Sequence, residues 1–138
     1  MIVTDTNVIA YLLIPGDQTE AARGALARDA VWAAPLLWRS ELRNVLRGYM
    51  LQRHLTLAKA REIQATAEEL MAGRELPVES ADVLGLAAAS GRSAYDCEFV
   101  ALSRALGVKL VTSDREVLKS FPDDTISLRD FAAGEPGA

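Results

Sequence analysis

The chain has 138 residues, 50% of them hydrophobic and 25% charged, with a formal net charge of −4 at pH 7. This length and composition predict one globular domain with a proper core. A single cysteine and a single histidine argue against a disulfide or a Cys- or His-based metal site, so any metal would be held by oxygen, which favours Mg²⁺ or Mn²⁺. No apolar run approaches the roughly 20 residues of a membrane span. No secretory signal is visible, so we expect a cytoplasmic protein without membrane contact.

The first seven residues predict a buried strand that gives way to a helix. Ile2 and Val3 are β-branched and apolar, and Asp5 ends the apolar run. The dense apolar pattern from Val8 to Leu13 then predicts a buried helix. In an open parallel α/β sheet, this places Asp5 at the carboxyl edge, where ligands bind.

The middle of the chain is predicted to be mostly helical. Asp17 or Thr19 is predicted to cap the first of these helices, Thr56 the third and Ser80 the fourth. In the second helix, Leu42, Val45, Leu46 and Tyr49 have the spacing of a core-facing stripe. The predicted helices cover residues 18–28, 36–52, 57–72 and 80–91, with a short strand at 31–34 and an extended piece at 76–78.

The last third returns to strands. Ser93 is predicted to cap a helix over 94–106, followed by a strand over 108–112 and an edge strand over 125–128. Strands alternate with helices along the chain, so we predict an α/β fold with a parallel sheet and helices on both faces. We expect a single domain over residues 1–132 and a flexible tail over 133–138.

Four acids are predicted to share the carboxyl edge of the sheet. Asp114 follows the strand at 108–112 as Asp5 follows the first strand, and Glu41 and Asp96 lie near the starts of two helices. At mutual separations of about 6 Å and an effective dielectric of about 20, each like-charge pair would cost about 2.8 kcal/mol. Such a cluster must hold extra protons or bind a cation. Metal-assisted attack of water on a phosphodiester suits this arrangement, with Thr6, Asn7, Thr112 and Ser113 as neighbours that orient carboxylates or waters.

Each acid also has a purely structural interpretation. Asp5 and Asp114 can be helix N-caps, and Asp96 can belong to a capping box with Ser93. Glu41 can pair with a nearby arginine. For any one acid alone, the structural interpretation is the better one. It explains less well why all four acids are predicted at the same edge of the sheet.

A basic stripe accompanies the acids. Six of the fifteen Lys and Arg residues lie between positions 39 and 61, and Arg39, Arg43 and Arg47 are spaced i, i+4 and i+8 along one helix. Such a stripe can bind the phosphates of a nucleic acid while the acids cut one of them. The alternative is an ordinary solvated helix face.

Four stretches of this sequence together resemble the PIN-domain ribonucleases, and most closely the VapC-type toxins of toxin–antitoxin pairs. These stretches are Val3 to Asn7, Ser40 to Leu42, Ser93 to Leu102 and Leu110 to Asp114. The resemblance implies a three-layer α/β/α sandwich, cleavage of RNA with Mg²⁺ or Mn²⁺, a homodimer and a cognate antitoxin that blocks the site. It also implies that Asp5, Glu41, Asp96 and Asp114 are the metal-binding acids.

Two other functions remain open at this point. A haloacid-dehalogenase-like phosphatase also uses an Asp after its first strand, but it requires a second acid two residues later, where this chain has Asn7. A non-catalytic RNA- or protein-binding module would show no metal-dependent activity.

Overall fold

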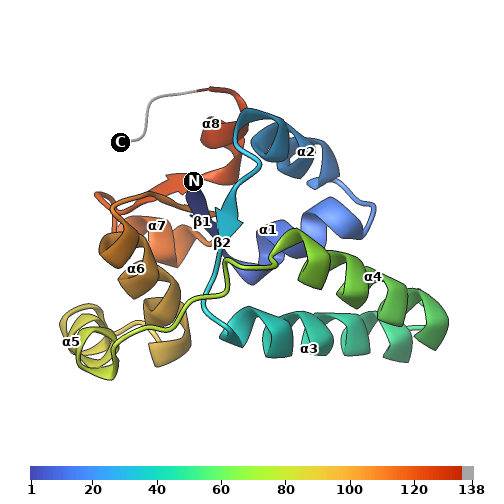
Figure 1. Cartoon of the computed structure of the whole chain (residues 1–138), viewed down its shortest axis with the longest axis horizontal. Helices are drawn as coiled ribbons and strands as arrows, with labels where there is room; N and C mark the ends of the chain where they lie inside the picture. The colour runs from blue at the N-terminus through green and yellow to red at the C-terminus, as the bar shows by residue number, and fades with distance from the viewer. Residues whose placement is uncertain (135–138) are drawn as a thin grey trace.

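The computed structural model describes residues 1–134 and has an α/β architecture (Figure 1). The strands are β1 (Ile2–Thr4), β2 (Trp32–Ala33), β3 (Leu110–Thr112) and β4 (Thr125–Ser127). The helices are α1 (Thr6–Leu13), α2 (Thr19–Arg28), α3 (Leu37–Leu51), α4 (Leu57–Leu70), α5 (Ser80–Ser90), α6 (Ala94–Leu106), α7 (Arg115–Ser120) and α8 (Leu128–Ala132).

The four strands form one parallel sheet in the order β2-β1-β3-β4. Helices flank the sheet, which confirms the predicted three-layer α/β/α fold. From β1 the chain moves to β2 on one side and then crosses over to β3 on the other side. The order of the strands therefore reverses between β1 and β3, and such a switch point is where open α/β sheets bind ligands.

The core contains most of the predicted apolar positions and both tryptophans. Val3 and Val111 in the central strands are fully buried, as are both tryptophans, Trp32 and Trp38. In α3, Leu42 and Leu46 are buried and Val45 partly so, but Tyr49, in the last turn of the helix, is 36% exposed.

Several predicted helix boundaries are confirmed by the caps. The Thr56 hydroxyl accepts a hydrogen bond from the Lys59 N–H, and the Ser93 hydroxyl accepts one from the Asp96 N–H. Gly107 ends α6 with a φ of +68°, a conformation that favours glycine.

Other boundary predictions are wrong. Neither Asp17 nor Thr19 caps α2, because the Thr19 hydroxyl instead donates to the Tyr11 carbonyl at 2.8 Å and ties α2 to α1. Ser80 is the first residue of α5 rather than its cap. The short helices α7 and α8 are not among the predicted elements. Of the predicted tail, only Ala133 and Gly134 are described, and their N–H groups bond to the last turn of α8.

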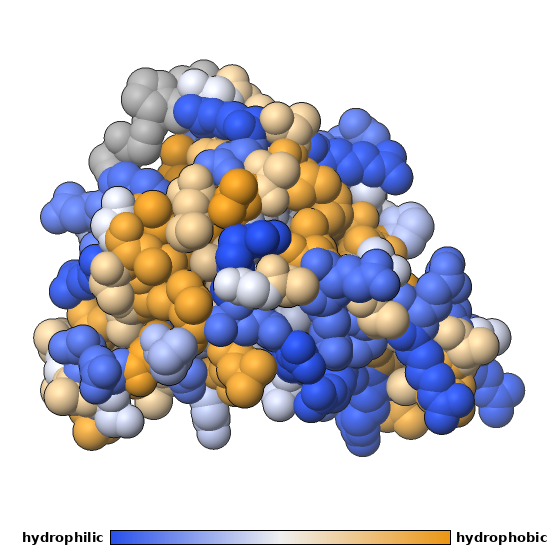
Figure 2. All heavy atoms as spheres, in the orientation of Figure 1, coloured by the Kyte–Doolittle hydropathy of each residue, from blue (hydrophilic) through white to orange (hydrophobic). Residues whose placement is uncertain are grey.

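Two broader features bear on function. Among residues 1–134, no helix is both long and apolar enough to cross a membrane. Hydrophilic side chains gather over the α3–α4 hairpin, whereas apolar ones dominate the face around α5 and α6 (Figure 2).

Candidate active site

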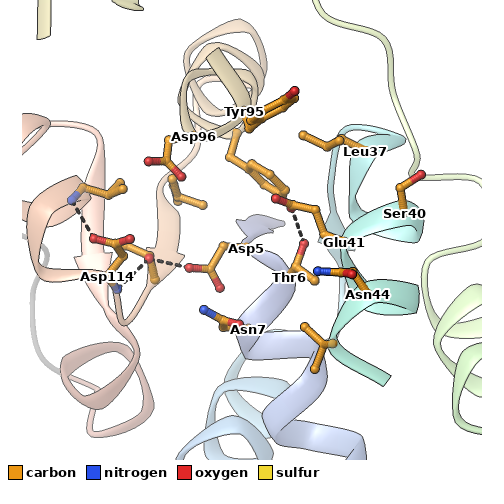
Figure 3. Close-up of a pocket in the computed structure, with 15 residues that line it drawn as sticks. Asp5, Thr6, Asn7, Leu37, Ser40, Glu41, Asn44, Tyr95, Asp96 and Asp114 are labelled. Atoms are coloured by element: carbon orange, nitrogen blue, oxygen red, sulfur yellow. Dashed lines mark hydrogen bonds between the residues drawn. The ribbon is translucent and has the colours of Figure 1, made fainter. Parts of the chain in front are cut away.

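A pocket of about 400 Å³ lies beside the carboxyl ends of β1 and β3, at the switch point of the sheet (Figure 3). The four predicted acids all line it, although they come from positions 5, 41, 96 and 114 of the chain. The sheet brings two of them together and two helices bring the others.

Asp5 and Asp114 are neighbours because β1 and β3 pair in parallel, with Thr4 opposite Val111. Thr112, the last residue of β3, connects the two acids. Its hydroxyl donates to Asp5 Oδ2 and accepts the backbone N–H of Asp114 at 3.0 Å. One buried threonine therefore fixes both acids relative to each other.

Both of these acids are also N-caps. Asp5 Oδ1 accepts the N–H of Val8 at 3.0 Å, and Asp114 Oδ1 accepts the N–H groups of Glu116 and Val117 at 2.9 and 3.1 Å. The capping role therefore does not conflict with the predicted metal-binding role, because each cap uses only one carboxylate oxygen. Within residues 1–134, Asp114 Oδ2 has no hydrogen bond and is left for a ligand.

Glu41 and Asp96 complete the pocket from α3 and α6. Thr6, in the first turn of α1, donates its hydroxyl to Glu41 Oε1 at 2.7 Å and so links α1 to α3. Asp96 lies in the first turn of α6, where the helix dipole favours a negative charge.

The acids oppose one another's ionisation. Burial, together with the charges of Asp114 and Glu41, raises the pKa of Asp5 from 3.8 to about 6, despite the hydrogen bonds from Thr112 and Val8. Burial and the charge of Asp96 raise the pKa of Glu41, against the Thr6 hydrogen bond. Burial and the charge of Asp114 raise the pKa of Asp96. The repulsion thus runs round a ring of four acids.

The four acids are less tightly grouped than the sequence predicted. Over the described part of the chain, no three carboxylate, thiol or imidazole groups lie close enough to form a ready ligand set for a metal ion. The donor chemistry still fits Mg²⁺ or Mn²⁺, since Mg²⁺ takes oxygen ligands and usually binds one or two carboxylates together with water and substrate phosphates. A closed cage of protein ligands, as structural zinc requires, is not what this pocket offers.

The predicted neighbours of the acids are only partly in place. Thr6, Asn7 and Thr112 line the pocket, but Ser113 does not. Three polar or aromatic lining residues were not predicted: Ser40, Asn44 and Tyr95. Asn44 lies at i+3 from Glu41, so helical periodicity around that acid is the signal that would have found it. Ser40 directly precedes Glu41 and lies one helical turn before Asn44.

The predicted basic stripe divides in two. The guanidinium of Arg39 pairs with Glu75 and with Glu68 (Nη2 to Glu75 Oε2 2.7 Å, Nη1 to Glu68 Oε1 3.1 Å). The hydrogen bond from Arg39 is the main reason why the pKa of Glu75 is lowered. Arg43 and Arg47 are exposed and, among residues 1–134, have no ionic partner. The side chain of Arg39 is thus engaged by acids of the scaffold, whereas those of Arg43 and Arg47 are not; that Arg39 binds RNA stays a prediction.

Comparison with known proteins agrees with this architecture. The fold and the acidic switch-point pocket define a PIN domain: the sequence matches the PIN domain family over residues 2–122, and the chain belongs to that family. Within the family it is of the VapC type. It is 30% identical over 134 residues to Ribonuclease VapC3 of Pyrobaculum aerophilum, a match that covers 88% of this chain and 95% of the relative.

A solved structure supports the fold independently. The crystal structure of PAE2754 from Pyrobaculum aerophilum superposes with a TM-score of 0.75, at 20% sequence identity, over 96% of this chain and 94% of that one. The family assignment contradicts the haloacid-dehalogenase alternative, for which Asn7 already stood in place of the required second acid.

Proposed function

We propose that this protein is a metal-dependent endoribonuclease and the toxin of a toxin–antitoxin pair. The observation that carries the proposal is the convergence of Asp5, Glu41, Asp96 and Asp114 on one pocket at the switch point of a PIN fold. The name of its relative, Ribonuclease VapC3, supports the same activity.

The four acids are the residues that would hold Mg²⁺ or Mn²⁺. Asp114 Oδ2 has no hydrogen bond within residues 1–134. The pKa values of Asp5, Glu41 and Asp96 are raised chiefly by burial and further by the charges of neighbouring acids, and a bound cation would offset both effects. The chemistry that a divalent ion supplies here is positive charge, which favours ionisation of water and stabilises negative charge on the phosphate oxygens.

The protein's own residues orient this chemistry. The Thr112 and Thr6 hydroxyls hold Asp5 and Glu41, and Asn7 presents an amide at the pocket. A carboxylate that accepts the proton of the attacking water lets its oxygen add to phosphorus. One P–O ester bond then breaks, and its leaving oxygen takes a proton from water, which leaves one phosphate end and one hydroxyl end on the RNA.

Binding of the RNA backbone falls to Arg43 and Arg47. Both side chains project from the exposed side of α3, the helix that also supplies Glu41, Ser40 and Asn44 to the pocket. The partners that we propose beyond RNA are a cognate antitoxin and a second copy of this chain, and the compartment that we propose is the cytoplasm.

The test is cleavage of total RNA by the purified protein, with Mg²⁺, with Mn²⁺ and with EDTA, followed by mapping of the cut ends. Asp114→Asn is the informative variant, because asparagine remains a good N-cap for α7 while the carboxylate is lost. Asp17→Asn, which changes an exposed acid of the α1–α2 turn, is the matched control. We expect metal-dependent cleavage by the wild type and the control, and none by Asp114→Asn. A wild type that binds RNA but cuts none would instead favour the non-catalytic module.

A further inference from the structure

One aromatic side chain is conspicuously outside the core. The chain has two tryptophans, three tyrosines and three phenylalanines. The tryptophans and phenylalanines are all at most 8% exposed, Tyr11 is partly buried and Tyr49 is 36% exposed. Tyr95 is 63% exposed. Exposure of a single apolar side chain is ordinary, so what distinguishes Tyr95 is the place where it lies.

Tyr95 lies at the mouth of the acidic pocket. It is the second residue of α6 and directly precedes Asp96. Its ring stands at the rim beside Leu37 of α3, above the acids (Figure 3). Phe99, one helical turn further along α6, is buried and lines the pocket on the same side. The rim above the acids is therefore aromatic and aliphatic, whereas the floor is acidic.

The scaffold makes little use of this ring. Within the described residues, the Tyr95 hydroxyl forms no hydrogen bond and the ring has no aromatic or cationic partner. By contrast, the ring of Tyr49, the next most exposed, packs against His54 at a centroid distance of 6.4 Å. The flat faces of Tyr95 are thus available to a ligand that also reaches the acids.

We propose that Tyr95 is a specificity-determining residue on which a nucleobase stacks, namely the base of a nucleotide that flanks the phosphate cut at the acids. Leu37 gives the stacked base an aliphatic contact beside the ring. This inference rests on the proposed function, because it takes RNA as the ligand of the pocket. A base can reach Tyr95 only when it is unpaired, so the residue selects unstructured RNA without selecting a particular base.

The test combines removal of the Tyr95 ring from the protein with removal of one base from the RNA. The substrate is a short single-stranded RNA with one mapped cut site, made in three forms: complete, abasic on the 5′ side of the scissile phosphate, and abasic on the 3′ side. Each form is assayed with the wild type, Tyr95→Ala and Tyr95→Phe. Base–aromatic stacking is usually worth about 1–3 kcal/mol, so Tyr95→Ala should lower kcat/KM for the complete RNA by about 5- to 140-fold.

The decisive result is whether the effects of Tyr95→Ala and of the missing base depend on each other. Removal of one of the two bases should lower kcat/KM for the wild type and for Tyr95→Phe by a similar factor, and should have little further effect on Tyr95→Ala. Leu84→Ala is the matched control: it also removes a large exposed apolar side chain (65% exposed), but from α5 and outside the pocket. That variant should respond to the missing base as the wild type does.

Three results would overturn the proposal. Fully additive losses at both positions would show that Tyr95 does not contact either base. A change in oligomeric state of Tyr95→Ala, measured by light scattering, with unchanged kcat/KM would assign the ring to a protein contact instead. A wild type without metal-dependent cleavage of the complete RNA would remove the proposed function itself, which distinguishes that failure from the other two.

Discussion

Replacement of Asp5 by Asn should stabilise the metal-free protein. The pKa of Asp5 rises from its ordinary value of 3.8 to about 6, chiefly through burial. At about 1.4 kcal/mol per pKa unit, ionised Asp5 therefore costs the folded state about 3 kcal/mol relative to the unfolded chain. Asparagine resembles the protonated acid: its carbonyl oxygen still accepts the Val8 N–H, and its amide can donate to the Thr112 hydroxyl.

The sign of the pH dependence follows from the raised pKa. The stability of the wild type that depends on protonated Asp5 is fully present below about pH 3.8 and is lost as the pH rises through about 6. The advantage of Asp5→Asn should therefore be small at pH 4, grow between pH 4 and 6, and level off above pH 6.5. At that plateau the gain in the free energy of unfolding should reach about 3 kcal/mol. The measured gain will be smaller, because an amide replaces a protonated carboxyl group only incompletely.

Urea unfolding in EDTA at pH 4, 5, 6 and 8 measures this difference directly. Asp17→Asn, an exposed acid outside the pocket, is the control and should show no such growth with pH. If Asp5→Asn were equally or less stable than the wild type at pH 8, the carboxylate would not be electrostatically strained, and the argument for a cation at this position would lose its basis.

Three further expectations concern the same region. Millimolar Mg²⁺ or Mn²⁺ should raise the melting temperature of the wild type near neutral pH, and Asp5→Asn should reduce this shift; an unchanged melting temperature in differential scanning fluorimetry would speak against a metal site. Replacing Arg43 and Arg47 by Gln should weaken RNA binding and flatten its salt dependence in anisotropy titrations, whereas Arg39→Gln should mainly lower the melting temperature. Thr112→Val should destabilise the protein by about 1–3 kcal/mol in urea, because it leaves the Asp114 N–H without its acceptor.

Much of the fold was predictable because its signals are local. Ile2 and Val3 before Asp5, the Ser93 cap and the Gly107 stop each act over a few residues, and the structure confirms them. The prediction of a cap at Asp17 or Thr19 failed because Thr19 uses its hydroxyl for a contact with α1 that no local pattern reveals.

The candidate site was predictable in its acids and less so in its surroundings. Strand ends and helix starts identified the four carboxylates, since parallel strands share a carboxyl edge. The spacing of Arg39, Arg43 and Arg47 could not reveal that Glu68 and Glu75 engage only the first of them, because that depends on how α4 and the segment after it fold back on α3. Tyr95 gave no sequence signal, as an exposed and a buried tyrosine look alike in a helix.

The pairing of Arg39 with Glu75 has a consequence for the geometry of the pocket. Glu75 also accepts the indole N–H of Trp38 at 2.8 Å, so this one carboxylate anchors two consecutive residues in the first turn of α3, just ahead of Glu41. Glu75 therefore holds the start of α3, the helix that carries Glu41, although Glu75 itself does not line the pocket. A Glu75 variant should therefore lose RNA cleavage through a change in the structure of α3. Cleavage assays alone would make Glu75 look like a catalytic residue, whereas its unfolding curve would show that its role is structural.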